Sequence, residues 1–198
     1  MSTEERDAWN ARYAEGRYTP RAETSPLLME WLPSIPVGRA LDVACGTGRT
    51  ALHLAEAGFH VDAVDISEVA IAAGREEAAR RGIASIDWSV ADLDEADLPG
   101  EGYDLITVLR YRNEALWPRL RAALAPNGWI FVDHHLQTSL DAGGPTNDEH
   151  RLAPGELLAA FQGFRILHYS ERVEAADLGS NPQFVVARFV ACAGDPGF

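Results

Sequence analysis

The sequence predicts an α/β protein with a single doubly wound, mostly parallel seven-stranded sheet that ends in an antiparallel C-terminal hairpin. From residue 39 onward, apolar strand-like segments alternate with helix-like segments. This order is typical of a parallel sheet with helices on both faces. The uniformly apolar segment 103–109 suits a central strand that is buried on both sides. Segments 164–171 and 183–190 read as two final strands with no clear helix between them, which indicates the hairpin.

Two helices are expected before the first strand. Residues 3–15 form a helical pattern in which Trp9 and Tyr13 lie one turn apart on one face. A second helix is expected over residues 26–32, because Ser25 is a favourable N-cap and a proline occupies the first turn.

The core elements then follow in order. Strands are expected at residues 39–44, 59–65, 84–90, 103–109 and 128–135. Helices are expected at residues 48–57, 67–81, 116–124 and 154–162. Residues 138–149 are polar and rich in turn formers, which predicts a mobile loop. Ligands of open α/β sheets bind beyond the carboxyl ends of the strands, so site residues are expected directly after these strands.

The stretch from Arg39 to Ala51 reads as an apolar strand, a tight glycine turn and the first turn of a helix. Gly46 and Gly48 supply the permissive backbone of such a turn, and they let a ligand approach the main chain closely. The following helix directs its free N–H groups and its positive dipole end toward whatever lies over the turn. The same spacing satisfies the dinucleotide-binding pattern, so a nicotinamide cofactor is an alternative at this point.

Two carboxylates accompany this turn. Asp42 lies inside the strand, where a charge is costly without a partner, so it is expected to hold an ammonium group or to brace the glycine loop. Asp65 ends the next strand, about 20 residues beyond the glycines, where an acid is placed to take both ribose hydroxyls. This placement suits NAD and S-adenosylmethionine (SAM) alike.

Length and charge narrow the possibilities. With 198 residues, the chain 1–198 is expected to form a single domain, with an N-terminal helical cap over 1–36 and an α/β core over 37–198. The formal net charge is -13. Such a charge disfavours a nucleic-acid partner or an anionic membrane surface.

The absence of lysine excludes a lysine Schiff base, a Walker-A lysine and a Tyr-x-x-x-Lys dehydrogenase site. Cys45 and Cys192 fit a reducing compartment without a disulfide framework. The sequence contains neither a membrane-spanning apolar run nor a signal-peptide core, so a soluble cytoplasmic protein is expected.

The glycine turn and the second strand end resemble the cofactor motifs of class I SAM-dependent methyltransferases. The matching segments are Leu41-Asp42-Val43-Ala44-Cys45-Gly46-Thr47-Gly48 and Val64-Asp65-Ile66-Ser67. Trp9-Asn10-Ala11-Arg12-Tyr13, the glycine turn and Arg110-Tyr111 are further similar to the tellurite-resistance and thiol-type small-molecule methyltransferases. The resemblance covers nearly the whole chain and implies the Rossmann-like methyltransferase fold, with SAM as the cofactor.

The resemblance also implies where SAM binds. The glycine turn would pass the methionine part, Asp65 would hold the ribose, and Ile66 would pack on adenine. Asp92 would take the adenine amino group, although an acid capping a turn is the alternative for this residue. The implied cofactor-binding residues are Asp42, Ala44, Cys45, Gly46, Gly48, Asp65, Ile66, Ala91, Asp92, Leu93 and Arg110.

Four residues after the fourth and fifth strands are the catalytic candidates. Arg110 is larger than the residues that many methyltransferases carry at this place, and it could reach the cofactor carboxylate or a substrate anion. If a base is needed, His134 and His135 are the candidates, because imidazole titrates near neutral pH. They are adjacent on a strand, so only one can face the pocket, and a structural role at the sheet edge is the alternative. Tyr111 completes the set; no metal is expected, because no third suitably spaced ligand is evident.

A polar substrate mouth is expected from Arg17, Tyr18, Arg110, Tyr111 and Arg112, with the loop 138–149 as a lid. Solvated surface is the alternative, and it is the favoured one for Arg17 and Arg112.

The sequence therefore predicts methyl transfer from SAM to a small-molecule acceptor, such as a thiol or a metalloid oxyanion. A non-catalytic SAM-binding or sensing protein and an NAD-dependent oxidoreductase are the alternatives. A monomer or a homodimer is expected, with no nucleic-acid or membrane partner.

Overall fold

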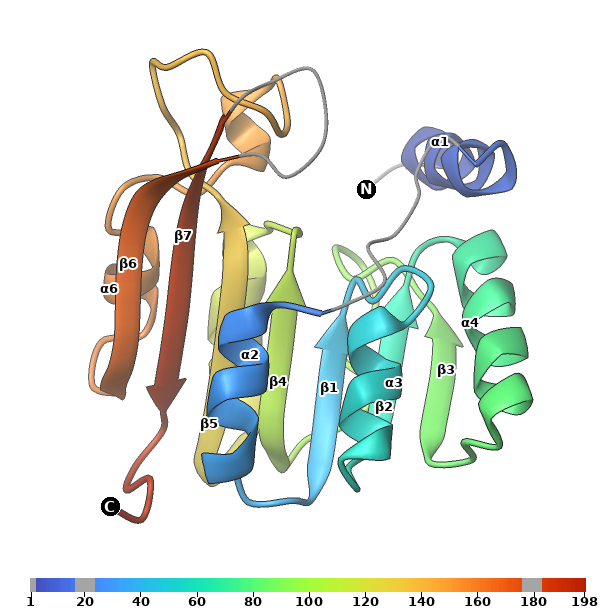
Figure 1. The fold of residues 1–198 in the computed structure, drawn as a ribbon, viewed down its shortest axis with the longest axis horizontal. Helices are drawn as coiled ribbons and strands as arrows, with labels where there is room; N and C mark the ends of the chain where they lie inside the picture. Colours follow the sequence, from blue (N-terminus) through green and yellow to red (C-terminus); the bar gives the residue numbers. More distant parts are fainter. Residues whose placement is uncertain (1–2, 17–23, 176–182) are drawn as a thin grey trace.

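A seven-stranded sheet forms the centre of the computed structural model, which describes residues 3–16, 24–175 and 183–198 (Figure 1). The strand order is β3-β2-β1-β4-β5-β7-β6. The strands are β1 (Arg39–Val43), β2 (His60–Asp65), β3 (Ile86–Val90), β4 (Tyr103–Leu109), β5 (Leu124–His135), β6 (Arg165–Ala175) and β7 (Gln183–Cys192). Strands β1 to β5 are parallel, whereas β7 pairs antiparallel with both β5 and β6. The predicted fold class is confirmed.

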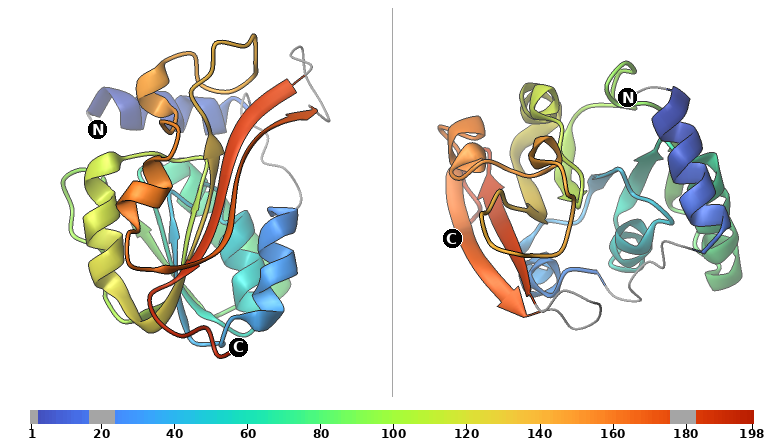
Figure 2. Two further views of the ribbon diagram at one scale, coloured as in Figure 1. Left: turned by 90° about the vertical axis from the view of Figure 1, so that its left-hand side faces the viewer. Right: turned by 90° about the horizontal axis from the view of Figure 1, so that it is seen from above.

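Helices cover both faces of the sheet. In Figure 2, α2 and α3 lie on one face, and α5 and α6 lie on the other. The α-helices are α1 (Thr3–Ala14), α2 (Pro26–Trp31), α3 (Arg49–Glu56), α4 (Glu68–Arg81), α5 (Trp117–Ala123) and α6 (Glu156–Ala160). Three short 3-10 turns are η1 (Leu32–Ser34), η2 (Glu114–Leu116) and η3 (Asp148–His150). The second expected helix ends one residue early as an α-helix, because Pro33 cannot supply the next backbone N–H.

Each face of the sheet has its own apolar core. On one face, Leu28 of α2 packs with Phe131 of β5 in a cluster that also contains the buried residues of α3. On the other face, Trp117 of α5 contacts Phe161 edge-on, with ring centroids 6.0 Å apart. Full burial of side chains of this size contributes about 1.5–3 kcal/mol each. The two cores fix the strand ends from which the site is built.

Helix α1 lies across the carboxyl-end edge of the sheet, beside α4 (Figure 1). The Asn10 side chain fastens it there, since its Oδ1 accepts from Ser67 Oγ at 2.7 Å and from the Val69 backbone N–H at 3.4 Å. No residue of α1 is fully buried. The helix is thus held at this edge mainly by polar contacts to the turn that begins α4.

The polar segment after β5, predicted as a mobile loop over 138–149, is anchored by one arginine. Arg151 is only 6% exposed, and its guanidinium donates to the carbonyl oxygens of Leu136 at 3.0 Å, Gly143 at 3.2 Å and Pro145 at 2.7 Å. Three charge-assisted hydrogen bonds from a buried side chain hold both ends of this segment together. Its mobility stays a prediction.

Candidate active site

Two connected hollows open at the carboxyl ends of β1, β2 and β4, beneath α1. A polar hollow of about 450 Å³ is lined by Tyr13, Asp42, Ala44, Cys45, Gly46, Thr47, Arg49, Thr50, Leu109 and Arg110. A more apolar hollow of about 550 Å³ is lined by Trp9, Tyr13, Ala44, Asp65, Ile66, Ala91, Leu93, Leu109, Arg110 and Tyr111. Because four residues line both hollows, the two form one elongated cavity.

The glycine turn forms the floor of the polar hollow. Ala44, Gly46 and Gly48 all have left-handed backbones, with φ of 51°, 58° and 78°. A Cβ atom on Gly46 would lie 2.7 Å from the Tyr13 hydroxyl, so glycine permits the close approach of Tyr13 to this turn. Gly48 lines neither hollow; a Cβ atom there would lie 2.1 Å from the Trp88 ring, so this glycine allows close packing under the turn.

Asp42 braces the start of α3. Its Oδ2 accepts from the Ala51 N–H at 3.0 Å, and its Oδ1 accepts from Thr107 Oγ1 at 2.8 Å. Burial raises the pKa of this carboxyl to about 7, although these two hydrogen bonds and the nearby Arg49 oppose the rise. Asp42 also lines the polar hollow, so bracing and ammonium binding are compatible roles for it.

Asp65 joins the ends of β1 and β2. Its Oδ2 accepts from the Gly46 N–H at 2.7 Å, and its Oδ1 accepts from the Ser67 N–H at 2.8 Å. Burial raises its pKa, and the backbone N–H donors oppose that rise. A carboxylate has about four acceptor sites, so each oxygen keeps one for a ligand hydroxyl. The expected ribose contact is therefore open to this residue.

Only some of the residues expected to contact adenine line the same hollow. Ile66, Ala91 and Leu93 line the apolar hollow as the sequence predicts, but Asp92 does not. The Oδ1 atom of Asp92 accepts from the Asp94 N–H at 3.0 Å, which is a turn-capping arrangement. A contact of Asp92 with adenine stays a prediction.

Arg110 borders both hollows. Its backbone is left-handed, with φ of 62°, and its N–H donates to the carbonyl oxygen of Asp133 at 2.9 Å. Its Nη2 lies 3.2 Å from Asp133 Oδ1, whereas its Nη1 is buried and makes no hydrogen bond. Tyr111 lines the apolar hollow, and its hydroxyl donates to Asp94 Oδ1 at 3.1 Å. Burial and the neighbouring Asp94 raise the pKa of Tyr111, so its phenol stays protonated.

The two histidines line neither hollow. His134 is buried, and its Nε2 lies 2.7 Å from the His150 carbonyl oxygen. His135 packs against Phe184, with ring centroids 5.5 Å apart. Burial lowers the pKa of His134 to about 4 and that of His135 to about 3, and the Arg110 charge contributes in both cases. A role as base stays a prediction for either residue.

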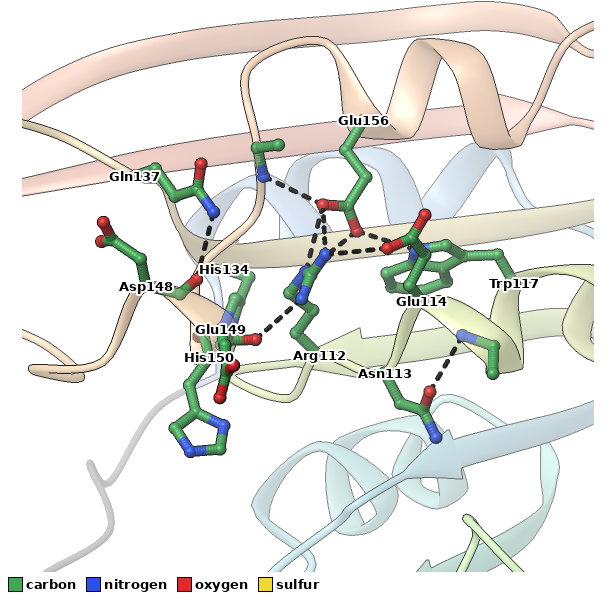
Figure 3. A network of polar contacts seen from close by, with 12 residues as sticks. Arg112, Asn113, Glu114, Trp117, His134, Gln137, Asp148, Glu149, His150 and Glu156 are labelled. Carbon is green, nitrogen blue, oxygen red and sulfur yellow. Dashed lines mark hydrogen bonds and ion pairs between the residues drawn. The ribbon is translucent and has the colours of Figure 1, made fainter.

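Arg112 belongs to a network that ties α6 to the turn after β4 (Figure 3). Its Nε and Nη2 donate to Glu156 at 2.9–3.1 Å, and its Nη1 donates to the Glu149 carbonyl oxygen at 2.7 Å. Trp117 Nε1 also donates to Glu156, at 3.0 Å. Arg112 therefore points away from the hollows into structural contacts, while Arg17 and Tyr18 of the expected mouth lie outside the described residues.

The sequence predicts an N-terminal helical cap over 1–36, but it places neither Trp9 nor Tyr13 at the site. Trp9 and Tyr13 lie one turn apart, with ring centroids 6.0 Å from each other, and both line the apolar hollow. Their helical spacing showed that they share a face, but only the fold shows that this face covers the strand ends. Thr47, Arg49, Thr50 and Leu109 are further lining residues that sequence reasoning missed.

Within residues 3–16, 24–175 and 183–198, no helix is both long and apolar enough to cross a membrane. No group of three or more His, Cys, Asp and Glu side chains there is placed to hold a metal ion.

Residues 40–128 match the family described as a methyltransferase domain. The ubiquinone biosynthesis O-methyltransferase of Bordetella avium is 25% identical over 199 residues, which cover 84% of this chain and 82% of that protein. Several other curated relatives are matched over about half of their length or less.

Solved structures share the fold. TehB from Haemophilus influenzae superposes with a TM-score of 0.77 at 21% identity, covering 91% of this chain and 66% of that one. A chain solved for the conversion of a disulfide bond into a thioacetal group during echinomycin biosynthesis gives 0.72 at 21% identity, covering 96% and 92%. Together with the domain match over residues 40–128, these findings support the predicted resemblance to the class I SAM-dependent methyltransferases, with SAM as the cofactor.

Proposed function

We propose that this protein transfers a methyl group from SAM to a small-molecule acceptor, with the cofactor lying along the two connected hollows. The observation that carries the proposal is the single cavity that joins Asp42 to Asp65 beneath α1. SAM has a zwitterionic amino-acid end and a nucleoside end. A polar hollow with a carboxylate and a neighbouring apolar hollow with a second carboxylate suit those two ends.

The residues present fit the cofactor in detail. In this proposal Asp65 accepts from the ribose hydroxyls, Asp42 faces the ammonium group, and Ala44, Cys45 and Gly46 border the methionine part. Ile66, Ala91 and Leu93 contact adenine, with Asp92 near its amino group and Gly48 supporting the turn. Gly46 lines the polar hollow without a Cβ atom, so its main chain stays accessible there, which supports this placement.

SAM supplies a methyl group on a positively charged sulfur. The acceptor donates an electron pair to the methyl carbon while the carbon–sulfur bond breaks, so S-adenosylhomocysteine leaves; a thiol acceptor loses its proton to solvent. This chain aligns the partners and excludes water, which is what an in-line displacement needs. Trp9 and Tyr13 supply the cover.

The environment of the site supports a soft acceptor. Tyr111 stays protonated, and both histidines are uncharged near pH 7 and lie outside the hollows. A thiolate or a metalloid oxyanion already carries its electron pair and needs little help from a base. A neighbour in the fold comparison comes from chemistry on a disulfide-derived sulfur, which also favours sulfur acceptors. The net charge of -13 supports a small molecule over a nucleic acid or an anionic membrane.

To test the proposal, the protein is incubated with methyl-labelled SAM and, in separate reactions, with pools of thiols, metalloid oxyanions, amines or alcohols. Label should appear in a thiol or metalloid product. Tight SAM binding without transfer to any pool would favour a sensing protein instead. Parallel assays of His134→Gln and His135→Gln decide whether a base is used: loss of transfer in one folded variant identifies it, and retained rates in both argue against a histidine base.

A further inference from the structure

Arg110 combines features that point to a ligand rather than to a structural role. It is one of three described residues other than glycine with a positive φ, and such strain concentrates at functional sites. Its Nη1 is buried without a hydrogen-bond partner, although a buried charged donor normally has one. The residue lines both hollows. Arg110 therefore borders the hollows with a partly exposed guanidinium that keeps an unused donor, and an anion could bind there.

The carboxylates around Arg110 do not fully neutralise its positive charge. Asp133 Oδ1 faces Arg110, while Asp133 Oδ2 accepts from Arg188 Nε at 2.9 Å and from Ser25 Oγ at 3.2 Å. Burial works to raise the pKa of Asp133, but the two guanidiniums outweigh it and hold that pKa below its ordinary value. Asp133 is therefore a shared counter-ion.

The cluster continues away from the cavity. Arg188 also forms a two-pronged ion pair with Glu174, and Glu174 in turn pairs with Arg172 at 2.7 Å. Three guanidiniums thus share two carboxylates, so the cluster carries one positive charge in excess. Its cavity end is Arg110, the member that borders the hollows.

The place of Arg110 in the sheet favours a contact with the methyl acceptor over a contact with the cofactor. Asp42, Asp65 and the apolar adenine wall come from β1, β2 and the turn after β3. Arg110 follows β4 and leans on Asp133 near the end of β5, the neighbouring strand on the other side. An anion on Arg110 would therefore approach from the β4–β5 side, next to the cofactor.

We propose that Arg110 is a specificity residue that binds an anionic group of the methyl acceptor through its guanidinium, which is partly exposed beside the hollows. The acceptor class is then a small thiol or chalcogen compound that carries a carboxylate or a similar anion. This inference rests on the proposed methyl transfer and on SAM occupying the two hollows.

A matched pair of thiols tests it. Mercaptoacetate and mercaptoethanol have chains of equal length but differ in charge, and the anionic one is the weaker acid at sulfur, so a preference for it does not come from thiolate content. The variants are Arg110→Gln, Arg110→Lys and, as a control with the same change in net charge, Arg165→Gln. Arg165 lies on β6 with half of its side chain exposed. Circular dichroism and thermal unfolding check that each variant folds.

The wild type should methylate mercaptoacetate with kcat/KM at least about tenfold above that for mercaptoethanol, as expected for one charge-assisted contact. Arg110→Gln should lose this preference, Arg110→Lys should keep part of it, and Arg165→Gln should keep all of it. The affinity for S-adenosylhomocysteine should fall by less than the preference does in the Arg110 variants, because Arg110 also borders the hollows assigned to SAM, and it should stay the same in Arg165→Gln. An absent preference in the wild type overturns the proposal, as does a tenfold loss of S-adenosylhomocysteine affinity with the preference intact.

Calorimetry separates this inference from the proposed function. Mercaptoacetate is titrated into the protein saturated with S-adenosylhomocysteine, where no transfer can occur. Binding that Arg110→Gln abolishes supports the role of Arg110 even if no thiol is methylated. Binding that persists in Arg110→Gln, or no binding to the wild type, contradicts it.

Discussion

Replacing Asp65 by asparagine should weaken the binding of S-adenosylhomocysteine while the fold survives. The carboxylate is 7% exposed, and it already accepts one backbone N–H on each oxygen. The amide nitrogen of asparagine cannot accept, so one ribose hydroxyl loses its acceptor. A hydrogen bond to a charged group contributes about 1.5–3 kcal/mol, so we expect an affinity loss of about 10- to 100-fold.

Two effects on folding stability oppose each other in this variant. The substitution removes a charge that burial disfavours, as the raised pKa of Asp65 indicates. It also leaves one N–H, of Gly46 or Ser67, facing an amide nitrogen instead of an oxygen. The misplaced N–H contact costs about 1–3 kcal/mol, and relief of the burial penalty offsets it, so the net change in the free energy of unfolding should be small.

Calorimetric titration with S-adenosylhomocysteine measures the affinity, and Asp62→Asn is the matched control. Asp62 lies on the same strand with the same 7% exposure, but it binds Arg39 and Tyr103, each at 2.7 Å, away from the hollows. The control should lose stability and keep its affinity. A Kd of Asp65→Asn within about threefold of the wild type would refute the ribose assignment, because even one lost charged hydrogen bond exceeds that change.

Three further predictions follow from the same contacts. Burial raises the pKa of Asp42 from 3.8 to about 7, so the folded state binds this proton more tightly than the unfolded state does. The free energy of unfolding should therefore fall as the pH rises between those two values, by about 4 kcal/mol for this group alone. Asp42→Asn should remove that decrease in denaturant titrations at several pH values; an equal slope in both proteins would contradict it. Gly48→Ala should lower the free energy of unfolding by about 2–5 kcal/mol, because the left-handed backbone and the contact with Trp88 both disfavour a Cβ atom. In the control Gly82→Ala the backbone is also left-handed, with φ of 73°, but the space is open, so the loss should be about 1–2 kcal/mol. Equal losses of the two variants in thermal unfolding would refute the clash with Trp88. Asn10→Ala should release α1 and lower the affinity for S-adenosylhomocysteine severalfold with little change in the unfolding temperature, and an unchanged affinity would mean that α1 does not cover the cofactor.

The order of elements was predictable because each strand and helix carries its own periodicity and caps. The apolar patterns of the predicted strands 39–44 and 103–109 are local signals, and the structure confirms both strands, with the first ending at Val43. The bounds of an element differ from the prediction where pairing with another strand sets them. Strand β5 was expected to begin at residue 128, but it begins at Leu124, which pairs with β4.

The lining of the hollows was also largely predictable, because the carboxyl ends of parallel strands meet at one edge. Asp42, Asp65 and Ile66 line the hollows as this rule expects. Contacts between distant segments were not predictable. The sequence around Trp9 does not indicate that its helix covers the hollows, and the sequence around Arg110 does not indicate its ion pair with Asp133.

The conformation of single residues was hidden as well. Gly48 belongs to the cofactor motif, yet its missing side chain makes room for Trp88. His134 and His135 look like exposed bases at a strand end, but burial beside Arg110 lowers the pKa of both. Burial depends on the segment that packs over a residue, and here that includes Phe184 from the far end of the chain.

Parallel calorimetric titrations of the purified protein with SAM, S-adenosylhomocysteine and NAD test the central claim most directly. The geometry of the two hollows predicts one site that binds SAM and S-adenosylhomocysteine with micromolar affinity, and no binding of NAD. Binding of NAD in preference to the adenosyl pair, or no binding of that pair, would contradict the assignment of the hollows to SAM.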